Sequence, residues 1–132
     1  MRLLITGVNH KTAPVEVREQ LAFDQDSLAA ALGDLRARCG LPEAMILSTC
    51  NRVEIAATAD DGADPSGEID RFLCDSRKVR LDFIRPHLYH YFDQEAIHHM
   101  FRVAASLDSM VVGEPQILGQ LKTAYAIAKA HG

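Results

Sequence analysis

The segment from Leu47 to Glu54 carries the residues with the clearest chemical potential in the chain. It places Cys50 between two short apolar runs, a pattern that predicts a turn between two strands. A thiol at such a turn is held on rigid backbone and stays accessible, as a nucleophile must be. Arg52 follows shortly after, and its guanidinium can bind a carboxylate or favour the thiolate. The alternative is that Cys50 is a small buried residue and Arg52 an ordinary surface charge.

The composition is that of a single globular domain. The 132 residues are 48% hydrophobic and 24% charged, which is enough apolar material to form a core. A net charge of −4 argues against sequence-independent binding of nucleic acid but permits a local contact with one RNA end. No apolar run approaches the roughly 18 residues of a membrane span. The three widely spaced cysteines predict a reducing cytoplasm rather than a disulfide framework, and without a CxxC pair no zinc site is expected.

The apolar pattern predicts the element order strand, helix, strand, strand, helix, strand. Strands are expected over residues 3–8, 44–49, 53–59 and 87–92, and helices over residues 15–21, from Asp24 or Asp26 to Cys39, and over residues 67–79. Two split β-α-β units of this kind fold as an α+β, ferredoxin-like plait, a four-stranded antiparallel sheet with helices on one face. Cys39 and Cys74 fall on or beside apolar helix faces, so we expect them to be structural. His87 and His90 would lie on opposite faces of a strand, which is poor geometry for a metal.

Two further helices are expected to complete the chain. The first begins at Asp93 and has an apolar stripe formed by Ile97, Met100, Phe101, Ala104 and Leu107. His99 lies away from that stripe, which predicts that it is either exposed to solvent or faces a cleft. The second helix begins at Pro115, with Gln116 and Gln120 one turn apart on one face.

Three segments of the chain together resemble the N-terminal catalytic domain of the glutamyl-tRNA reductase family. They are GVNHKTAPV at residues 7–15, STCNRVE at residues 48–54, and HMFRVAASLDSMVVGEPQILGQLK at residues 99–122. The resemblance extends over essentially the whole chain. It implies an NADPH-dependent oxidoreductase that converts the glutamyl group of glutamyl-tRNA(Glu) to glutamate-1-semialdehyde, in tetrapyrrole (porphyrin and haem) biosynthesis.

The resemblance also implies a role for each candidate site residue. Cys50 attacks the ester carbonyl and forms a thioester with the glutamyl group, while His99 assists near the thiol. Arg52 binds a carboxylate of the glutamyl group, with Thr49 and Asn51 helping to hold it. The remaining substrate-binding residues that it implies are Ser109, Glu114, Pro115, Gln116 and Gln120.

The chain departs from the family pattern in its domain content. Family members continue into an NADPH-binding domain and a helical dimerisation domain, but no G-x-G-x-x-G motif follows a strand here. We therefore expect residues 1–132 to be a single catalytic domain that cannot complete the reduction alone. The resemblance implies glutamyl-tRNA(Glu) as a partner, a homodimer for the full-length protein, and glutamate-1-semialdehyde aminomutase as a candidate partner.

Two functions of other classes stay open on the residues alone. One is a plait module that binds RNA or a partner protein and in which Cys50 is inert. The other is a cysteine hydrolase with a dyad of Cys50 and His99. Rapid alkylation of Cys50 would argue against the binding module, and a hydrogen bond between Cys50 and His99 would favour the dyad.

Overall fold

An antiparallel sheet forms the centre of the chain, whose computed structural model describes residues 2–111, with no account of the side chains at 101 and 104–111. Its strands are β1 (Arg2–Asn9), β2 (Glu43–Ser48), β3 (Arg52–Ala59) and β4 (Tyr89–Phe92). They lie in the order β2-β3-β1-β4, and every neighbouring pair is antiparallel. This is the strand order of a ferredoxin-like plait, so the predicted fold class is confirmed.

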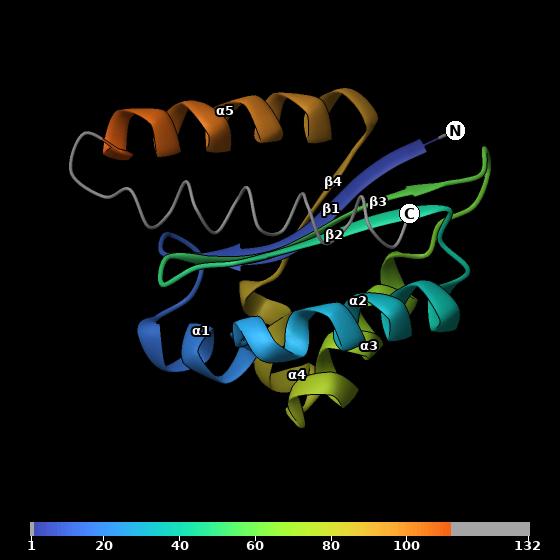
Figure 1. The fold of residues 1–132 in the computed structure, drawn as a ribbon, viewed down its shortest axis with the longest axis horizontal. Coiled ribbons are helices and arrows are strands. Elements are labelled where there is room, and N and C mark those ends of the chain that lie inside the picture. Colours follow the sequence, from blue (N-terminus) through green and yellow to red (C-terminus); the bar gives the residue numbers. More distant parts are fainter. Residues whose placement is uncertain (1, 112–132) are drawn as a thin grey trace.

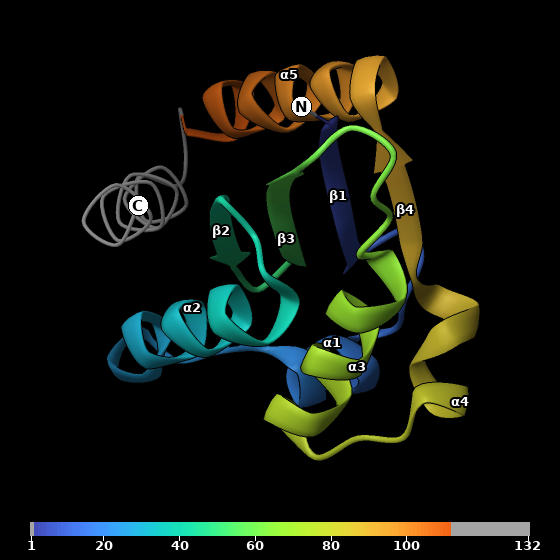
Figure 2. The same ribbon diagram turned by 90° about the vertical axis from the view of Figure 1, so that its right-hand side faces the viewer.

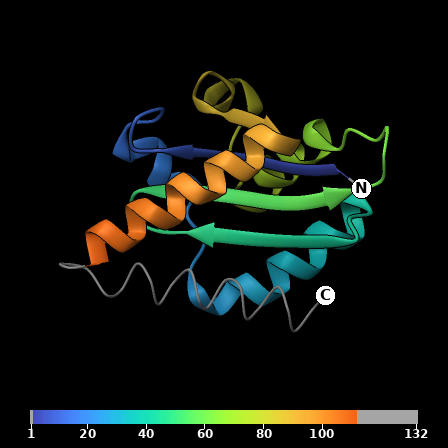
Figure 3. The same cartoon turned by 90° about the horizontal axis from the view of Figure 1, so that it is seen from above.

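Helices cover both faces of the sheet (Figures 1 and 2). On one face lie α1 (Val15–Leu21), α2 (Gln25–Cys39), α3 (Ser66–Arg77) and α4 (Leu81–Ile84). On the other face α5 (Asp93–Val111) crosses the strands obliquely, as the view from above shows (Figure 3). None of the helices within residues 2–111 combines the length and the apolar character that a bilayer crossing requires. The candidate site lies between the sheet and α5.

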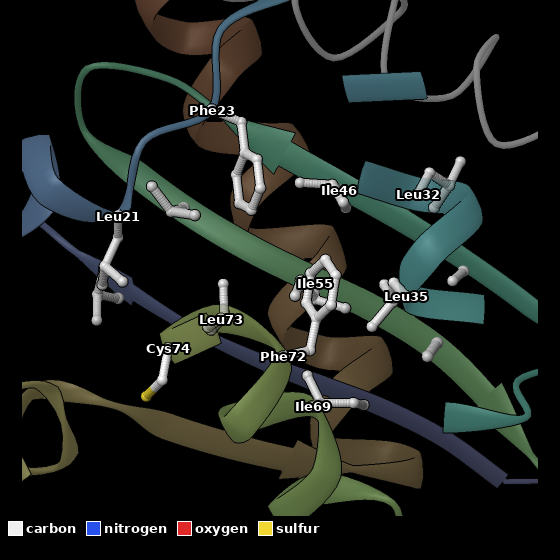
Figure 4. Packing of buried hydrophobic residues seen from close by; sticks show 14 of the residues in the cluster. Leu21, Phe23, Leu32, Leu35, Ile46, Ile55, Ile69, Phe72, Leu73 and Cys74 are labelled. Carbon is white, nitrogen blue, oxygen red and sulfur yellow. The ribbon is translucent and has the colours of Figure 1, made fainter. Parts of the chain in front are cut away.

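The main core fills the space between the sheet and the first three helices (Figure 4). Along β3, Val53, Ile55 and Ala57 face this core, as the alternation of the strand predicts. Phe72 of α3 stacks on Phe23, with ring centroids 6.4 Å apart. The residues between the core-facing ones on β3 are therefore directed toward α5.

The bounds of α2 follow directly from local chemistry. The Asp24 side chain accepts a hydrogen bond from the Ser27 N–H at 2.9 Å, which caps the first turn. Gly40 ends the helix in the left-handed conformation, with φ of 62°. Of the two predicted caps, Asp24 and Asp26, the structure selects Asp24, and the helix ends at Cys39 as predicted.

The segment before β4 differs from the prediction. His87 belongs to a 3-10 turn, Arg85–His87, and β4 begins only at Tyr89, so the predicted strand from His87 is wrong at its start. Pro86 explains the difference, since it favours the first positions of a helical turn and cannot donate to a strand ladder. The short helix α4 was not predicted. The helix expected from Pro115 lies outside the described residues.

The orientation of α5 is the main correction to the sequence interpretation. Ile97 and Met100, placed on the predicted buried stripe, are 43% and 40% exposed. Ala96, His99 and Val103 face the sheet instead and are 0%, 5% and 8% exposed. For these two residues the stripe does not predict burial, because the sheet beneath the helix carries a buried carboxylate, which provides a partner for a histidine. His99 is therefore buried against the sheet and is not exposed to solvent.

Gly7 allows the strands to approach closely on the α5 side of the sheet. A Cβ at this position would lie 2.9 Å from both Cα and Cγ of Glu54 and still closer to the Val53 carbonyl oxygen. Because the backbone atoms of the neighbouring strand cannot easily move away from this Cβ, we expect Gly7→Ala to lower the free energy of unfolding by about 1–3 kcal/mol in urea titrations. Gly33→Ala in α2 is the control, because a Cβ there meets no atom within 4 Å. It should stabilise the chain by about 0.5–1 kcal/mol, and similar losses for both variants would contradict this account.

Candidate active site

Cys50 lies in the turn that joins β2 to β3, and it is exposed. Thr49 organises this turn: its Oγ1 accepts hydrogen bonds from the backbone N–H groups of Asn51 and Arg52, each at 3.1 Å. The Thr49 N–H in turn donates to the Arg52 carbonyl at 2.8 Å. The turn thus holds Cys50 on well-anchored backbone while the side chain stays accessible, as a nucleophile requires. Thr49 itself is buried, so in this structure it shapes the turn.

The other two cysteines lie in less accessible surroundings. Cys39 is half-buried on α2, and Cys74 is buried on α3. Burial raises the pKa of both thiols, and nearby carboxylates, Glu68 for Cys39 and Asp70 for Cys74, raise it further. Both residues pack on the main core, which confirms their predicted structural character.

This contrast predicts a selective modification. At pH 8 we expect iodoacetamide to alkylate Cys50 at least about tenfold faster than Cys39 or Cys74, because reaction requires an accessible thiolate. Peptide mass spectrometry over a time course measures the three rates in the same sample. Unfolding the chain in guanidinium should bring the three rates together, which serves as the internal control. Equal and slow labelling in the folded chain would instead favour the binding module with an inert cysteine.

A carboxylate on the α5 side of the sheet connects three polar side chains, and we call Arg52, Glu54, Tyr89 and His99 the Glu54 cluster. Arg52 Nη1 donates to Glu54 Oε1 at 3.1 Å, and the Tyr89 hydroxyl donates to Oε2 at 2.9 Å. His99 Nε2 is also hydrogen-bonded to Oε2. Glu54 is 5% exposed, so these bonds replace the water that a surface carboxylate would have.

The sheet register explains how Tyr89 reaches Glu54. Gly7 of β1 lies opposite Glu54 on β3 and opposite Tyr89 on β4. Directly opposed residues share a face of the sheet, and at Gly7 no side chain separates the two. The cluster therefore depends on a glycine in the strand between its members.

The ionisation of the Glu54 cluster follows from its surroundings. Burial alone raises the pKa of Glu54, but the hydrogen bond from His99, the charges of His99 and Arg52, and the Tyr89 hydroxyl outweigh it, so that the pKa falls below its usual value. Burial and the charge of Glu54 raise the pKa of Tyr89, which keeps its hydroxyl protonated as a donor. An ionised carboxylate only accepts, so His99 carries its proton on Nε2 toward Glu54. Nδ1 is then the ring nitrogen that is not bound to Glu54.

His99 is also held by aromatic packing. Its ring lies 4.6 Å from the ring of Tyr91 and 5.3 Å from that of Tyr89, measured between centroids. Within residues 2–111 no hydrogen bond joins His99 to Cys50, and Nε2 is committed to Glu54. The structure therefore does not show the direct Cys50–His99 dyad that a cysteine hydrolase would use.

A polar pocket of about 520 Å³ opens beside the Cys50 turn. Its lining residues come from the end of β1 and the loop after it, the turn, β3, β4 and α5: Asn9, His10, Lys11, Asn51, Arg52, Tyr91, His99, Arg102 and Val103. Three predicted site residues, Asn51, Arg52 and His99, thus meet at one pocket, and Cys50 directly precedes Asn51. A smaller apolar pocket of about 130 Å³ adjoins it and shares His99 and Val103.

Several predicted residues cannot be placed, and two unpredicted ones join the site. The side chain of Ser109 and the residues Glu114, Pro115, Gln116 and Gln120 lie outside the described part of the chain. Glu54 and Tyr89 were not proposed from the sequence. The sequence contains a signal for Glu54, because Glu54 lies two residues after Arg52 and so on the same face of the strand. Tyr89 is far from both residues in the sequence, and no local pattern connects it to them. Within residues 2–111 His, Cys, Asp and Glu form no cluster of three or more that could hold a metal ion.

Comparisons with known proteins agree on one family. The family model for the N-terminal domain of glutamyl-tRNA(Glu) reductase matches residues 6–132. The glutamyl-tRNA reductase of Solibacter usitatus (strain Ellin6076) is 64% identical over 132 residues, and that of Pelobacter propionicus is 52% identical over 128 residues. The solved structure of glutamyl-tRNA reductase from Methanopyrus kandleri matches 97% of this chain with a TM-score of 0.71 and 34% identity. The chain spans 31%, 29% and 28% of these three proteins.

Proposed function

This chain belongs to the glutamyl-tRNA reductase N-terminal domain family, and from that premise we propose that it transfers the glutamyl group of glutamyl-tRNA(Glu) onto Cys50. The acyl-enzyme is the substrate for NADPH-dependent reduction to glutamate-1-semialdehyde, in tetrapyrrole biosynthesis. One observation carries the proposal. An accessible thiol on anchored backbone stands beside a pocket that presents a guanidinium and an oriented imidazole.

The covalent step needs few groups. The Cys50 thiolate attacks the carbonyl carbon of the ester, a C–S bond forms, and the C–O bond to the terminal ribose breaks. The departing ribose oxygen takes up a proton from water, which balances the proton that the Cys50 thiol released, so the tRNA leaves with a free hydroxyl. The thioester accepts hydride more readily than a carboxylate, which divides a difficult reduction into two feasible steps. His99, with Nε2 bound to Glu54, offers Nδ1 for proton transfer within the pocket.

Arg52 is the group that binds the side-chain carboxylate of the glutamyl residue in this proposal. One of its guanidinium N–H groups donates to Glu54, which fixes the plane of the fork. A guanidinium has five N–H donors, so others stay available to a second carboxylate in the polar pocket. Asn51, which lines the same pocket, adds an amide that can donate or accept. A pocket of this kind rejects analogues that lack the carboxylate, because its polar groups would be left unpaired.

NADPH does not fit the described residues. Dinucleotides bind at a glycine-rich turn between a strand and a helix, where free N–H groups face the pyrophosphate. The loop from β1 to α1 contains no glycine, and the N–H groups of Lys11 and Thr12 already donate to Asn9 Oδ1. We propose that NADPH binding, the reduction and the homodimer contact belong to other domains of the longer protein.

The experiment that tests the function is acylation by charged tRNA. The chain is incubated with glutamyl-tRNA(Glu) carrying labelled glutamate, and its peptides are analysed by mass spectrometry. We expect one glutamyl group on Cys50, released by hydroxylamine as a thioester is. A label on Cys39 or Cys74 instead, or no label under conditions in which the chain is folded, would refute the proposal.

A further inference from the structure

The described lining of the polar pocket carries more positive charge than its proposed amino-acid ligand needs. Three fixed cations line it, Lys11, Arg52 and Arg102, and none of the described lining residues is acidic. The chain as a whole has a net charge of −4, so this concentration of cations runs against the overall balance. Such a pocket focuses a positive potential on whatever enters it.

Two of the three cations have no counter-charge in the described structure. Arg52 forms an ion pair with Glu54 at 3.1 Å. Among the described side chains no ion pair joins Lys11 or Arg102 to another residue, and both residues are exposed. Arg102 follows His99 by one helical turn on α5 and lines the pocket with it. As far as residues 2–111 are described, the two cations are therefore available to a ligand.

The loop that carries Lys11 is anchored by several hydrogen bonds. Asn9 Oδ1 accepts hydrogen bonds from the N–H groups of Lys11 at 2.9 Å and Thr12 at 3.2 Å. Thr12 Oγ1 accepts from the Asn9 N–H at 3.0 Å, and His87 Nδ1 donates to the Thr12 carbonyl at 2.9 Å. The loop thus places Lys11 beside the pocket from fixed backbone, which reduces the entropy lost on binding.

The titration of His10 agrees with a positive potential at this place. Burial lowers the pKa of His10, and the charges of Arg52, Lys11 and Arg18 lower it further. His10 lines the same pocket, and its lowered pKa favours the neutral ring, so the fixed charges of the lysine and the arginines dominate there.

The charges of the substrate indicate which of its groups binds Lys11 and Arg102. A glutamyl ester has one carboxylate and one ammonium group, and Arg52 is sufficient for the carboxylate. The RNA to which that ester is attached has a phosphodiester between successive nucleotides, and the last of these adjoins the reacting ribose. We propose that Lys11 and Arg102 bind phosphodiesters of the 3′-terminal nucleotides of the tRNA, and so bring the ester to Cys50. This inference rests on the proposed function and adds a phosphate-binding site to it.

The test compares two acyl donors, glutamyl-tRNA(Glu) and 3′-O-glutamyl adenosine, which has no phosphate. For Lys11→Gln and Arg102→Gln, we expect the ratio of the Cys50 acylation rate from tRNA to that from the adenosine ester to fall about tenfold each. The salt dependence of tRNA binding should also weaken, by a slope of about 0.7 for each lost contact. Arg80→Gln is the matched control, because Arg80 is an exposed arginine at the start of α4 on the opposite side of the sheet. It should change neither quantity.

The outcomes separate this inference from the proposed function. If the unsubstituted protein is acylated by neither donor, the proposed function itself fails. If it is acylated by both, and the variants keep the normal ratio and the normal salt slope, Lys11 and Arg102 do not bind phosphate. If the substitutions lower the Cys50 acylation rate equally for both donors, they disturb the site in general, and the inference is also overturned. Urea unfolding of each variant checks that the fold is intact.

Discussion

Replacing Cys50 with serine is expected to lower the rate of glutamyl transfer from tRNA by at least about 10³-fold, as the loss of a nucleophile does in other covalent enzymes. A cysteine is a few per cent thiolate near pH 7, whereas a serine hydroxyl needs a general base in contact with it. No described residue is hydrogen-bonded to Cys50 in that way, since His99 Nε2 is bound to Glu54. The serine would occupy the same exposed place without becoming a nucleophile.

The measurement is the single-turnover release of tRNA from glutamyl-tRNA(Glu), followed with the serine variant in excess. Cys39→Ala is the matched control, because that cysteine is half-buried on the far side of the sheet and should leave the rate near normal. The free energy of unfolding of Cys50→Ser should change by less than about 0.5 kcal/mol, since the side chain is exposed. A normal rate for Cys50→Ser would remove the thioester from the mechanism.

The parts of the site that follow from local chemistry could be predicted from the sequence. The alternation of β3 separates core-facing Val53 and Ile55 from Glu54, and the structure keeps that separation. The polar break after Leu47 predicts the turn that exposes Cys50. In both cases neighbouring residues carry all the information, because strand geometry and turn chemistry act over a few positions.

The Glu54 cluster could not be predicted in the same way. Its members come from two strands and a helix, and they meet only because Gly7 brings Tyr89 and Glu54 to the same level of the sheet. The rotation of α5 is decided by this buried carboxylate and not by the apolar stripe that contains Met100. A pattern of hydrophobic residues reports where apolar burial is favourable, but it does not report where a buried charge needs a donor.

The buried carboxylate of Glu54 has a positioning role in the proposed mechanism. One carboxylate orients both the guanidinium that binds the substrate and the imidazole that moves a proton, so a single residue fixes two groups of different function. Such positioning matters because small displacements of catalytic groups cost large factors in rate. Glu54 contacts neither the substrate nor the thiol in this proposal, so we regard it as a positioning residue.

Glu54→Gln is therefore expected to lower the free energy of unfolding at pH 7 by about 3–5 kcal/mol, because it leaves the Arg52 cation buried without its counter-charge. The folded pKa of Glu54 is lowered, so its stabilising effect is present above the usual value of 4.5 and disappears as the pH falls through the folded pKa. The difference between the variant and the unsubstituted protein should accordingly shrink below pH 4.5. Urea titrations from pH 3 to pH 8 measure this difference.

Two comparisons give the Glu54 prediction its specificity. Tyr89→Phe removes one donor but leaves the ion pair with Arg52, so it should cost only about 0.5–1.5 kcal/mol. Asp82→Asn breaks the ion pair with Arg80, in which the aspartate and arginine side chains are 70% and 85% exposed, and should be nearly neutral. The amide that Glu54→Gln introduces cannot accept from all three donors, so His99 loses its fixed proton position and the rate of transfer from tRNA should fall by about 10². A Glu54→Gln variant as stable and as active as the unsubstituted protein would show that Arg52 and His99 are positioned without this carboxylate.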